Sequence, residues 1–387
     1  MDIVIVGGGI IGTMHAFLAV RAGHRVVQIE REDEARGASV RNFGLVWISG
    51  RAPGAELDLA LRARELWDEV GAAVPGVSLR ANGSLTIARS DAEAAVLAQV
   101  CDRDCADDRG FALLDPRSAR ALNPALRGRF TAALQCTRDA VVEPRVAAKA
   151  IRTALSEEDG YRWLPGREVV EYGERYVVDD HGATHRGDLV VLATGAWHRG
   201  LLGPHLGGVD STVRRCRLQM MQTEPLDEPL TTSVADGDSL RYYPGFATPA
   251  LKRLPAQLPV PAAFHMQLLM VQRLDGSLTI GDTHAYVEPF DFDLPEQPYQ
   301  HLVSVAEVIL GRPLPPIRRR WAGVYSQLQP DVPGRRDPLS GGPISSGLYH
   351  RSWPAPGVVL VTGPGGRGMT LSPAIAEETL ALAEVSR

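Results

Sequence analysis

The chain has 387 residues, 44% hydrophobic and 22% charged, which is enough for a globular protein of two or three domains with a sizeable core. Its formal net charge of −5 gives no reason to expect a nucleic acid partner. No apolar run reaches the length of a membrane span, and we expect no signal peptide because a strand pattern begins at residue 2. Four scattered cysteines argue against a disulfide framework and for a cytoplasmic location. Cys101 and Cys105 are four residues apart, but two ligands do not make a metal site, so no metal is expected.

The first eleven residues after Met1 carry the strongest pattern. Residues 3–6 are four consecutive β-branched apolar residues, which predict a buried strand. A helix is expected to start near Ile10 and Ile11, and its N-terminus would offer N–H groups and a positive dipole end to phosphates. Between strand and helix the chain fits G-x-G-x-x-G, which suits a tight turn, a close pyrophosphate and close helix packing, with Gly7, Gly9 and Gly12.

A second strand, residues 25–29, runs into Glu30, 18 residues after Gly12. An acid at this place suits the two hydroxyls of an adenosine ribose and argues against a 2′-phosphate. Strand, glycines, helix, strand and acid in this order predict binding of an ADP-containing dinucleotide. The alternative is a tight strand–helix turn that binds nothing.

The rest of the first half mixes helices and strands. The second half of the loop over residues 31–44 is small and polar, as in backbone held close to a ligand, although a surface loop would look similar. Residues 188–197 predict a buried strand with a small-residue turn, suited to a second nucleotide contact. We also expect helices over residues 54–74, 91–105, 115–122 and 144–156 and strands over 84–88, 131–136, 168–172 and 176–179.

From residue 213 the pattern changes to strands separated by turn signals, with candidates over residues 214–223, 239–244, 263–271 and 277–281. The proline-rich residues 248–261 predict a long loop, and residues 302–310 a helix. A buried strand over residues 356–362 then meets a second glycine turn, Gly363 to Thr370. Ser372-Pro373 is expected to start a final helix that runs to about Val385.

These segments together resemble the FAD-dependent D-amino-acid-oxidase superfamily, in its glycine oxidase and sarcosine oxidase branch. The resemblance covers essentially the whole chain and keeps the motif order of that family. The resembling pieces are Gly7–Gly12 with Glu30, Ser39–Gly44, Ala193–Trp197, Trp321–Gly323 and Gly363–Pro373.

The resemblance implies an α/β fold (α+β overall) with a FAD-binding Rossmann-like domain, discontinuous in sequence, and an inserted, largely antiparallel substrate domain. The FAD-binding domain is expected over residues 1–85, 141–212 and 323–387, and the substrate domain over 86–140 and 213–322.

The resemblance also implies which residues bind FAD. The first glycine turn would hold the pyrophosphate, the backbone at Val169 would face the adenine, and amides of residues 366–370 would lie near the flavin N1, C2 carbonyl and N3. The expected cofactor residues are Gly7, Gly9, Ile10, Ile11, Gly12, Glu30, Arg31, Ser39, Asn42, Phe43, Gly44, Val169, Thr194, Gly195, Trp197, Gly366, Arg367, Gly368, Met369 and Thr370.

The implied chemistry is oxidation of the C–N bond of a small primary or secondary amine by hydride transfer to flavin N5. The resulting imine hydrolyses to an aldehyde or keto product and an amine, and O2 would reoxidise the flavin with formation of H2O2. No dedicated base is obligatory. Amino-acid-using members often carry Trp-x-Gly-x-Arg, whose arginine clamps the substrate carboxylate.

In this chain that motif reads Trp321-Ala322-Gly323-Val324-Tyr325, with tyrosine in place of the arginine. Another cation must take a carboxylate, or the substrate carries a different acidic group. The catalytic candidates are Arg217, Arg241, Tyr242, Tyr325 and His265, with Arg241 to Tyr243 expected on a strand. Further candidate cations are Arg214, Arg215, His284, Arg318, Arg319, Arg320 and Arg351.

This departure also resembles a subgroup associated with phosphonate catabolism that oxidises N-methylated 2-aminoethylphosphonate. A dianionic tetrahedral group favours several arginines and hydroxyls over one planar fork. The expected substrate is therefore a small amine, with an N-methylated aminoalkylphosphonate as the specific hypothesis.

The electron acceptor stays open, because neither Lys149 nor Lys252 matches the lysine that sarcosine oxidases place over the flavin. An amino-acid dehydrogenase that passes electrons to a quinone or carrier is the second interpretation. A noncatalytic flavoprotein scaffold is a third. A plain NAD-dependent dehydrogenase fits the first glycine turn but leaves the last one without a purpose.

Overall fold

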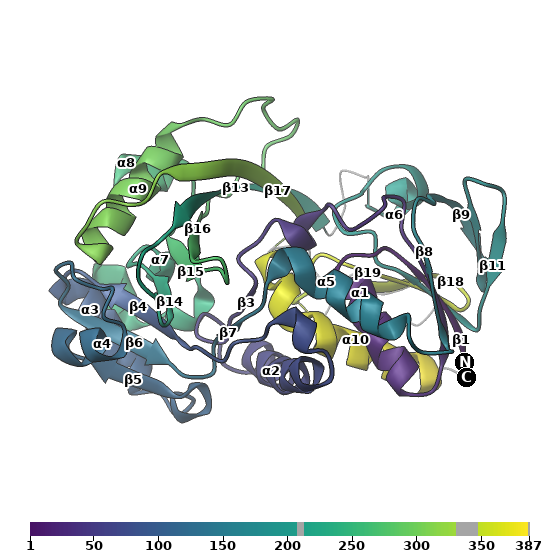
Figure 1. Ribbon diagram of the computed structural model, residues 1–387, viewed down its shortest axis with the longest axis horizontal. Helices are drawn as coiled ribbons and strands as arrows, with labels where there is room; N and C mark the ends of the chain where they lie inside the picture. The colour runs from purple at the N-terminus through teal and green to yellow at the C-terminus, as the bar shows by residue number, and fades with distance from the viewer. Residues whose placement is uncertain (207–212, 330–346, 386–387) are drawn as a thin grey trace.

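The structure is a computed structural model that describes residues 1–206, 213–329 and 347–385. Two sheet-centred lobes lie side by side in Figure 1, with both chain termini at the outer end of one lobe. That lobe is built on a parallel sheet and the other on a larger, mostly antiparallel sheet. The α/β fold class expected from the sequence is confirmed.

The parallel sheet is covered on both faces. Ile3 and Ile5 of its central strand point into the core beneath the helices, whereas Val4 and Val6 point into the core on the opposite face. Only the edge strand β18 runs antiparallel to its neighbour. In sheet order the strands are β18 (His350–Ala355), β19 (Val358–Thr362), β12 (Leu189–Leu192), β1 (Asp2–Val6), β2 (Arg25–Ile29) and β8 (Tyr161–Leu164).

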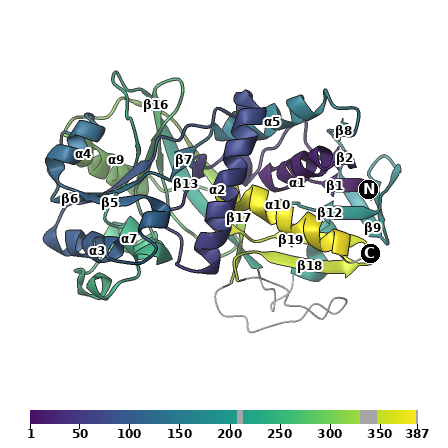
Figure 2. The ribbon, with the colours of Figure 1, turned by 90° about the horizontal axis from the view of Figure 1, so that it is seen from below.

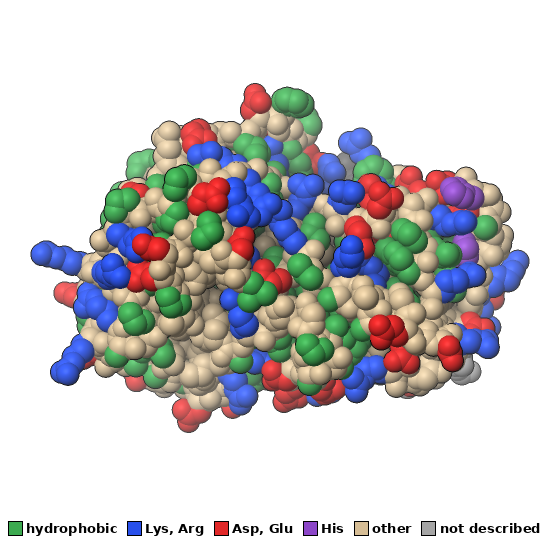
Figure 3. All heavy atoms as spheres, in the orientation of Figure 1, with side chains coloured by type: hydrophobic (Ala, Val, Ile, Leu, Met, Phe, Trp, Pro, Cys, Tyr) green, Lys and Arg blue, Asp and Glu red, His purple; other side chains and the backbone are tan. Residues whose placement is uncertain are grey.

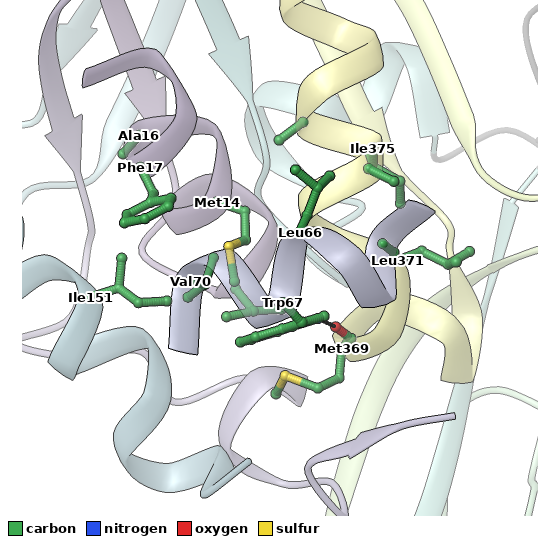
Figure 4. Packing of buried hydrophobic residues seen from close by; sticks show 14 of the residues in the cluster. Met14, Ala16, Phe17, Leu66, Trp67, Val70, Ile151, Met369, Leu371 and Ile375 are labelled. Carbon is green, nitrogen blue, oxygen red and sulfur yellow. Dashed lines mark hydrogen bonds between the residues drawn. The ribbon is translucent and has the colours of Figure 1, made fainter. Parts of the chain in front are cut away.

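Four helices pack together over one face of this sheet, and Figure 4 shows how their side chains interdigitate around Trp67. The opposite face is covered by a three-stranded sheet and by α6 (Gly203–Leu206). The four helices are α1 (Ile10–Arg21), α2 (Ala55–Ala73), α5 (Pro144–Leu155) and α10 (Gly368–Val385). The three strands are β9 (Val169–Gly173), β10 (Tyr176–Asp179) and β11 (Thr184–Arg186).

The second sheet has eight strands, and its longest pair, β13 and β17, forms one edge. Along β13 the side chains of Cys216, Leu218 and Met220 lie on the face that looks toward the first lobe, whereas Met221 packs under α9. In sheet order the strands are β17 (Ile317–Leu328), β13 (Val213–Pro225), β16 (Ser277–Gly281), β15 (Leu269–Gln272), β14 (Ser233–Ala235), β4 (Ser84–Ala88), β6 (Ala132–Cys136) and β5 (Phe111–Leu114).

Short helices cover both faces of this second sheet: α4, α8 and α9 pack on the face that carries Met221, whereas α3 and α7 pack on the opposite face. A two-stranded ribbon and α2 lie where the lobes meet (Figure 2). The covering helices are α3 (Asp91–Cys101), α4 (Pro116–Leu122), α7 (Ser239–Tyr242), α8 (Pro259–Ala263) and α9 (Gln297–Leu310). The ribbon consists of β3 (Leu45–Val46) and β7 (Ala140–Val141). No helix in the described ranges has the length and apolar content to cross a bilayer.

Some expected elements are wrong. Residues 239–244 form α7 and a 3-10 turn instead of a strand, because the Asp236 carboxylate accepts the Ser239 N–H (3.2 Å) and starts a helical turn. Arg241 and Tyr242 therefore sit on a helix. The strand expected over 263–271 begins only at Leu269, and the helix expected over 91–105 ends at Cys101.

His265 was expected on that strand, but it lies in a turn with a φ of +48°. The left-handed conformation places it at a change of chain direction between α8 and β15. The proline-rich stretch is less irregular than expected, since it holds a 3-10 helix over Pro249–Arg253 and the start of α8.

The last helix starts at Gly368, four residues before the expected Ser372-Pro373 start. Proline inside a helix leaves the carbonyl four residues earlier without its N–H partner. Here that carbonyl belongs to Met369, and it accepts from Trp67 Nε1 (3.0 Å, the dashed line in Figure 4) and from Ser372 Oγ (3.2 Å). The helix can therefore run through Pro373.

The division into domains stays a proposal. The expected limits at 85 and 322 fall inside β4 and β17, and both strands belong to the eight-stranded sheet. We propose to keep the alternation of segments and to move these two limits to the ends of the strands.

Candidate active site

A cavity of about 820 Å³ lies between the two lobes and is lined by residues from both. One end is lined by residues of the first glycine segment (residues 7–12) together with Glu30 and Ser39. Its wall continues along the second glycine segment (residues 363–370). The other end, here called the tyrosine end, is lined by Trp47, Tyr242, Tyr243, Gln267, Asp282, His284, Tyr286 and Tyr325.

The first glycine segment presents bare backbone to the cavity. Gly7 has a φ of +116°, and a Cβ there would lie 2.3 Å from the Ala193 oxygen, so only glycine fits. At Gly9 a Cβ would meet only Ser39 Oγ at 3.0 Å, so the space over Gly9 opens to the cavity. Ser39 Oγ also accepts the Ile10 N–H (2.8 Å) and ties the loop to the start of α1.

Glu30 lies at the end of β2 with its carboxylate fixed at the cavity wall. One carboxylate oxygen accepts the Gly8 N–H at 2.6 Å, and the other accepts the Glu32 N–H at 3.1 Å. The acid is held by backbone N–H groups, which leaves it able to receive ribose hydroxyls. This role for Glu30 stays a prediction.

The second glycine segment is anchored from the first lobe's helices. Trp67 Nε1 donates to the carbonyls of Met369 (3.0 Å) and Thr370 (3.2 Å). Thr370 Oγ1 accepts the Trp47 N–H at 2.9 Å, so this segment also fixes a residue of the tyrosine end. The guanidinium of Arg367 donates to Glu56 at 2.8 Å.

Most of the expected cofactor residues come together in this cavity. Gly12, Gly44 and Thr370 do not line it: a Cβ at Gly12 would lie 2.2 Å from the Gly7 oxygen, and one at Gly44 would lie 2.1 Å from the Val142 oxygen. Both glycines thus serve close packing behind the wall. The expected residues that line the cavity are Gly7, Gly9, Ile10, Ile11, Glu30, Arg31, Ser39, Asn42, Phe43, Val169, Thr194, Gly195, Trp197, Gly366, Arg367, Gly368 and Met369.

Two of the five expected catalytic residues line the cavity, and three do not. Tyr242 and Tyr325 line the tyrosine end. Arg217, Arg241 and His265 do not line the cavity. Arg217 donates to the Asp291 carbonyl (2.5 Å), and Arg241 donates to the Pro255 carbonyl (2.5 Å). The structure therefore does not bring these three side chains to the place where a substrate contact was expected.

Of the other candidate cations, Arg215 and His284 line the cavity, and Arg215 is paired with Glu288. Sequence reasoning missed Arg51, which lines the cavity and is 4% exposed. Its guanidinium donates to the Trp47 carbonyl (2.7 Å) and lies 3.4 Å from Glu56. No motif marks Arg51, and its only signal is its position shortly after the Ser39–Gly44 loop.

Asp282, also missed, follows β16 and is 6% exposed at the tyrosine end. Gln267 Nε2 donates to its Oδ1 at 3.1 Å, and its Oδ2 lies 3.7 Å from His284 Nε2. Burial raises the pKa of Asp282 to about 8 and lowers that of His284 to about 4. Within the described residues no arginine or lysine nitrogen lies within ion-pair distance of this carboxyl.

The phenols around Asp282 stay neutral. Burial raises the pKa values of Tyr242, Tyr243 and Tyr325, and the nearby carboxylate adds to the effect in each. The Tyr242 ring stacks on His284 with centroids 4.4 Å apart and meets Tyr243 edge-on at 4.9 Å. The tyrosine end is thus a wall of packed, uncharged aromatic side chains around a buried carboxyl.

The fold and cavity define a class: a two-lobed protein whose single cavity runs from two glycine segments to a wall of aromatic and polar side chains. A family model described as "DAO: FAD dependent oxidoreductase" matches residues 2–382. The chain therefore belongs to this family of FAD-dependent oxidoreductases.

Several solved structures share this fold at low sequence identity. Glycine oxidase from Bacillus cereus covers 100% of this chain and 95% of its own, with 19% identity and a TM-score of 0.75. L-proline dehydrogenase from P. horikoshii covers 100% and 94%, with 21% identity and a TM-score of 0.76. Among characterised sequences, a subunit of the opine oxidase of Rhizobium meliloti is 26% identical over 209 residues. That match spans 50% of this chain and 56% of the length of the relative.

FAD is the cofactor of this family, and the residues present fit it. The open space over Gly9 admits a pyrophosphate against the backbone, and the buried hydroxyl of Thr194 lines the cavity without a hydrogen-bond partner among the described residues. No cluster of His, Cys, Asp and Glu suited to a metal ion occurs in the described part of the chain.

Proposed function

We propose that this protein oxidises the C–N bond of a small primary or secondary amine that also carries an acidic group. One observation carries the proposal: a single cavity is lined by both glycine segments and by the polar side chains of the tyrosine end. Bound FAD supplies the hydride acceptor. The residues named in the sequence analysis that line the cavity are proposed to hold it.

Arg51 is proposed to take over the role that the missing arginine at Tyr325 has in amino-acid-using relatives. Arg51 and Arg367 flank one carboxylate, Glu56, which leaves one positive charge in excess at this buried cluster. The pKa of Tyr243 responds to both Arg51 and Asp282, so the phenol lies within electrostatic reach of a cation and an acid. A small zwitterion would find a partner for each of its charges along this wall.

A group of arginines that includes Arg41 of the cavity wall is proposed to attract anions. Basic side chains gather near the centre of the face in Figure 3. Burial, and then repulsion by Arg319, Arg41 and Arg318, lowers the pKa of Arg145, and Arg41 also lines the cavity. Such a field raises the local concentration of an anionic substrate. This supports, as the more specific proposal, an N-methylated aminoalkylphosphonate.

The acceptor of the electrons is proposed to be O2. A dehydrogenase that passes electrons to a quinone or carrier is the second candidate, because neither Lys149 nor Lys252 lines the cavity. Lys149 lies 3.9 Å from Glu34, and its side chain is 64% exposed.

The test is to mix the purified holoenzyme with sarcosine, glycine, D-amino acids and N-methylated 2-aminoethylphosphonate and to follow amine loss and peroxide in air. Turnover of an acidic amine with one peroxide per product supports the oxidase. Turnover only with an added dye acceptor supports the dehydrogenase. Faster turnover of sarcosine and glycine than of the phosphonate overturns the substrate proposal, and no turnover of any amine overturns the function.

A further inference from the structure

Asp282 lines the cavity, and no arginine or lysine among the described residues pairs with its carboxyl. It is enclosed by the second sheet and by the segment that carries Tyr242 and Tyr243, and it lines the cavity. A carboxylate buried without a cation loses the solvation it has in water, and this cost disappears only when a proton or a cation joins it. Gln267 supplies one N–H to it, which does not neutralise the charge.

The surrounding groups cannot provide that cation. His284 Nε2 is 3.7 Å away, but burial keeps the imidazole neutral at neutral pH by lowering its pKa to about 4. The titratable groups that face Asp282 from the neighbouring elements are Tyr242, Tyr243, Tyr286, Tyr325, Cys216 and His284. Burial raises the pKa values of the four phenols and raises that of Cys216 to about 11. Asp282 is therefore the member of this set that changes charge between pH 5 and pH 10.

Two further buried polar atoms at this end make no hydrogen bond within the described residues. Gln267 Oε1 and Trp47 Nε1 have no hydrogen-bond partner among the described residues, and both residues line the cavity. The acceptor on Gln267 belongs to the same side chain that donates to Asp282. An N–H-bearing cation at this place could donate to Gln267 Oε1 and to the Asp282 carboxylate at once, whereas the Trp47 N–H is a donor and suits an acceptor atom of the ligand.

We propose that Asp282 binds the substrate's ammonium group in the cavity and removes its proton before oxidation. This inference rests on the proposed amine chemistry and adds to it the residue that receives the nitrogen. The N–H bond of the ammonium breaks, an O–H bond forms on Asp282, and the electron pair of the broken bond stays on nitrogen. Nothing is oxidised or reduced in this step, and charge is conserved because ammonium and carboxylate become amine and carboxylic acid.

The order of events follows from general amine chemistry. Hydride can leave the carbon only when nitrogen carries a free electron pair, and an amine with a pKa near about 10 is almost fully protonated at pH 7. Only about one molecule in 1,000 is then neutral in solution. With Asp282 as a local acceptor, the protein can use the abundant ammonium form.

The first test measures binding without turnover. The holoenzyme is titrated with tetramethylammonium chloride, and with tert-butanol as a neutral control, at several pH values while the visible flavin spectrum is followed. In the wild type the affinity for the cation should rise as the pH passes about 8, where Asp282 ionises, and affinity for tert-butanol should stay constant. A pH-independent affinity for the cation would overturn the proposal, and this measurement needs no variant.

The second test uses Asp282→Asn, which keeps the shape but not the charge, with Asp236→Asn as the matched control. Asp236 is also buried, and burial raises its pKa to about 7, but it does not line the cavity. At pH 7 the kcat/KM of D282N should fall on the order of 100-fold, and the defect should shrink as the pH approaches the pKa of the amine. D236N should keep the wild-type pH profile.

A structural role for Asp282 would instead lower kcat/KM equally at every pH, and that result overturns the proposal, as does wild-type activity of D282N. If D282N keeps the wild-type affinity for tetramethylammonium while amines still reduce the flavin, Asp282 is excluded and the proposed function survives. If no amine reduces the wild-type flavin, the proposed function fails, whereas the cation titration still decides whether Asp282 binds ammonium.

Discussion

The first glycine segment and the tyrosine end line the same cavity but offer a ligand different things. Around Gly7 and Gly9 the wall is backbone, and its shape depends on the absence of side chains. At the tyrosine end the wall consists of side chains from α7, from β17 and from residues next to α7, β3, β15 and β16. A backbone site needs glycines at fixed spacing and can be recognised in a sequence. A side-chain site needs only that distant strands meet, so it leaves no local pattern.

The two regions should respond differently to pH, and this is the largest expected effect on stability. The folded protein holds the proton of Asp282 up to about pH 8, whereas an unfolded chain releases it near pH 4. Because the folded state binds more protons in this window, stability falls as the pH rises, by about 1.4 kcal/mol per pH unit for one group. Asp282→Asn should flatten that slope in denaturant titrations between pH 5 and pH 8. An unchanged slope would mean that this carboxyl is not held protonated.

Replacing Arg51 with methionine tests whether this arginine binds the acidic group of the substrate. Loss of a buried, hydrogen-bonded charge costs about 2–5 kcal/mol in binding, which is about 30- to 5,000-fold in KM for an acidic amine. Amines without an acidic group should be affected much less. Arg241→Met is the matched control, since that arginine lies outside the cavity and should leave KM unchanged. Equal losses for acidic and plain amines would contradict a role of Arg51 in recognition.

Gly9→Ala tests the backbone site without disturbing the fold. Within the protein the new methyl meets only Ser39 Oγ, so it fills space that the cofactor is proposed to use. Overpacking of about 1–3 kcal/mol corresponds to about 5- to 150-fold weaker FAD binding, measured by titration of the apoprotein. Gly203→Ala is the control, because a Cβ at Gly203 would meet nothing within 4 Å and Gly203 does not line the cavity. If G9A binds FAD as tightly as G203A, the cofactor does not approach Gly9.

Trp67→Phe tests the anchor of the second glycine segment. The change removes one N–H from two buried carbonyls, including the Met369 carbonyl that Pro373 leaves without a helical partner. Stability should fall by about 1–3 kcal/mol in denaturant unfolding, and bound flavin should be released earlier on heating. Unchanged flavin release would show that α10 holds this segment without Trp67.

The smallest expected effect belongs to Tyr325→Phe, which removes one hydroxyl from the tyrosine end and leaves its packing intact. A single hydrogen bond contributes about 0.5–1.5 kcal/mol, so kcat/KM should fall about 2- to 12-fold. A loss above about 100-fold would show that Tyr325 does more than contact the substrate.

The contrast between the backbone site at the glycines and the side-chain site at the tyrosine end also explains which parts could be predicted from the sequence. The strand, glycines and helix of residues 2–21 were predicted because each step has a local cause. Asp282 and Arg51 were not, since an isolated acid and an isolated arginine look like surface residues until the fold buries them. The final helix starts earlier than predicted because Trp67, far away along the chain, satisfies the carbonyl that its proline leaves free. β17 was not anticipated, since only Trp321 to Tyr325 was recognised as a motif and not as part of a strand.

The central claim is that one cavity holds FAD and the amine side by side, with the cofactor along the two glycine segments and the ammonium at Asp282. A crystal structure of the holoenzyme, soaked with tetramethylammonium above pH 8 so that Asp282 is ionised, would test this most directly. The account predicts FAD against the backbone of Gly9 and Gly366 and the cation next to the Asp282 carboxylate. FAD bound away from either glycine segment, or a cation bound only outside the cavity, would contradict it.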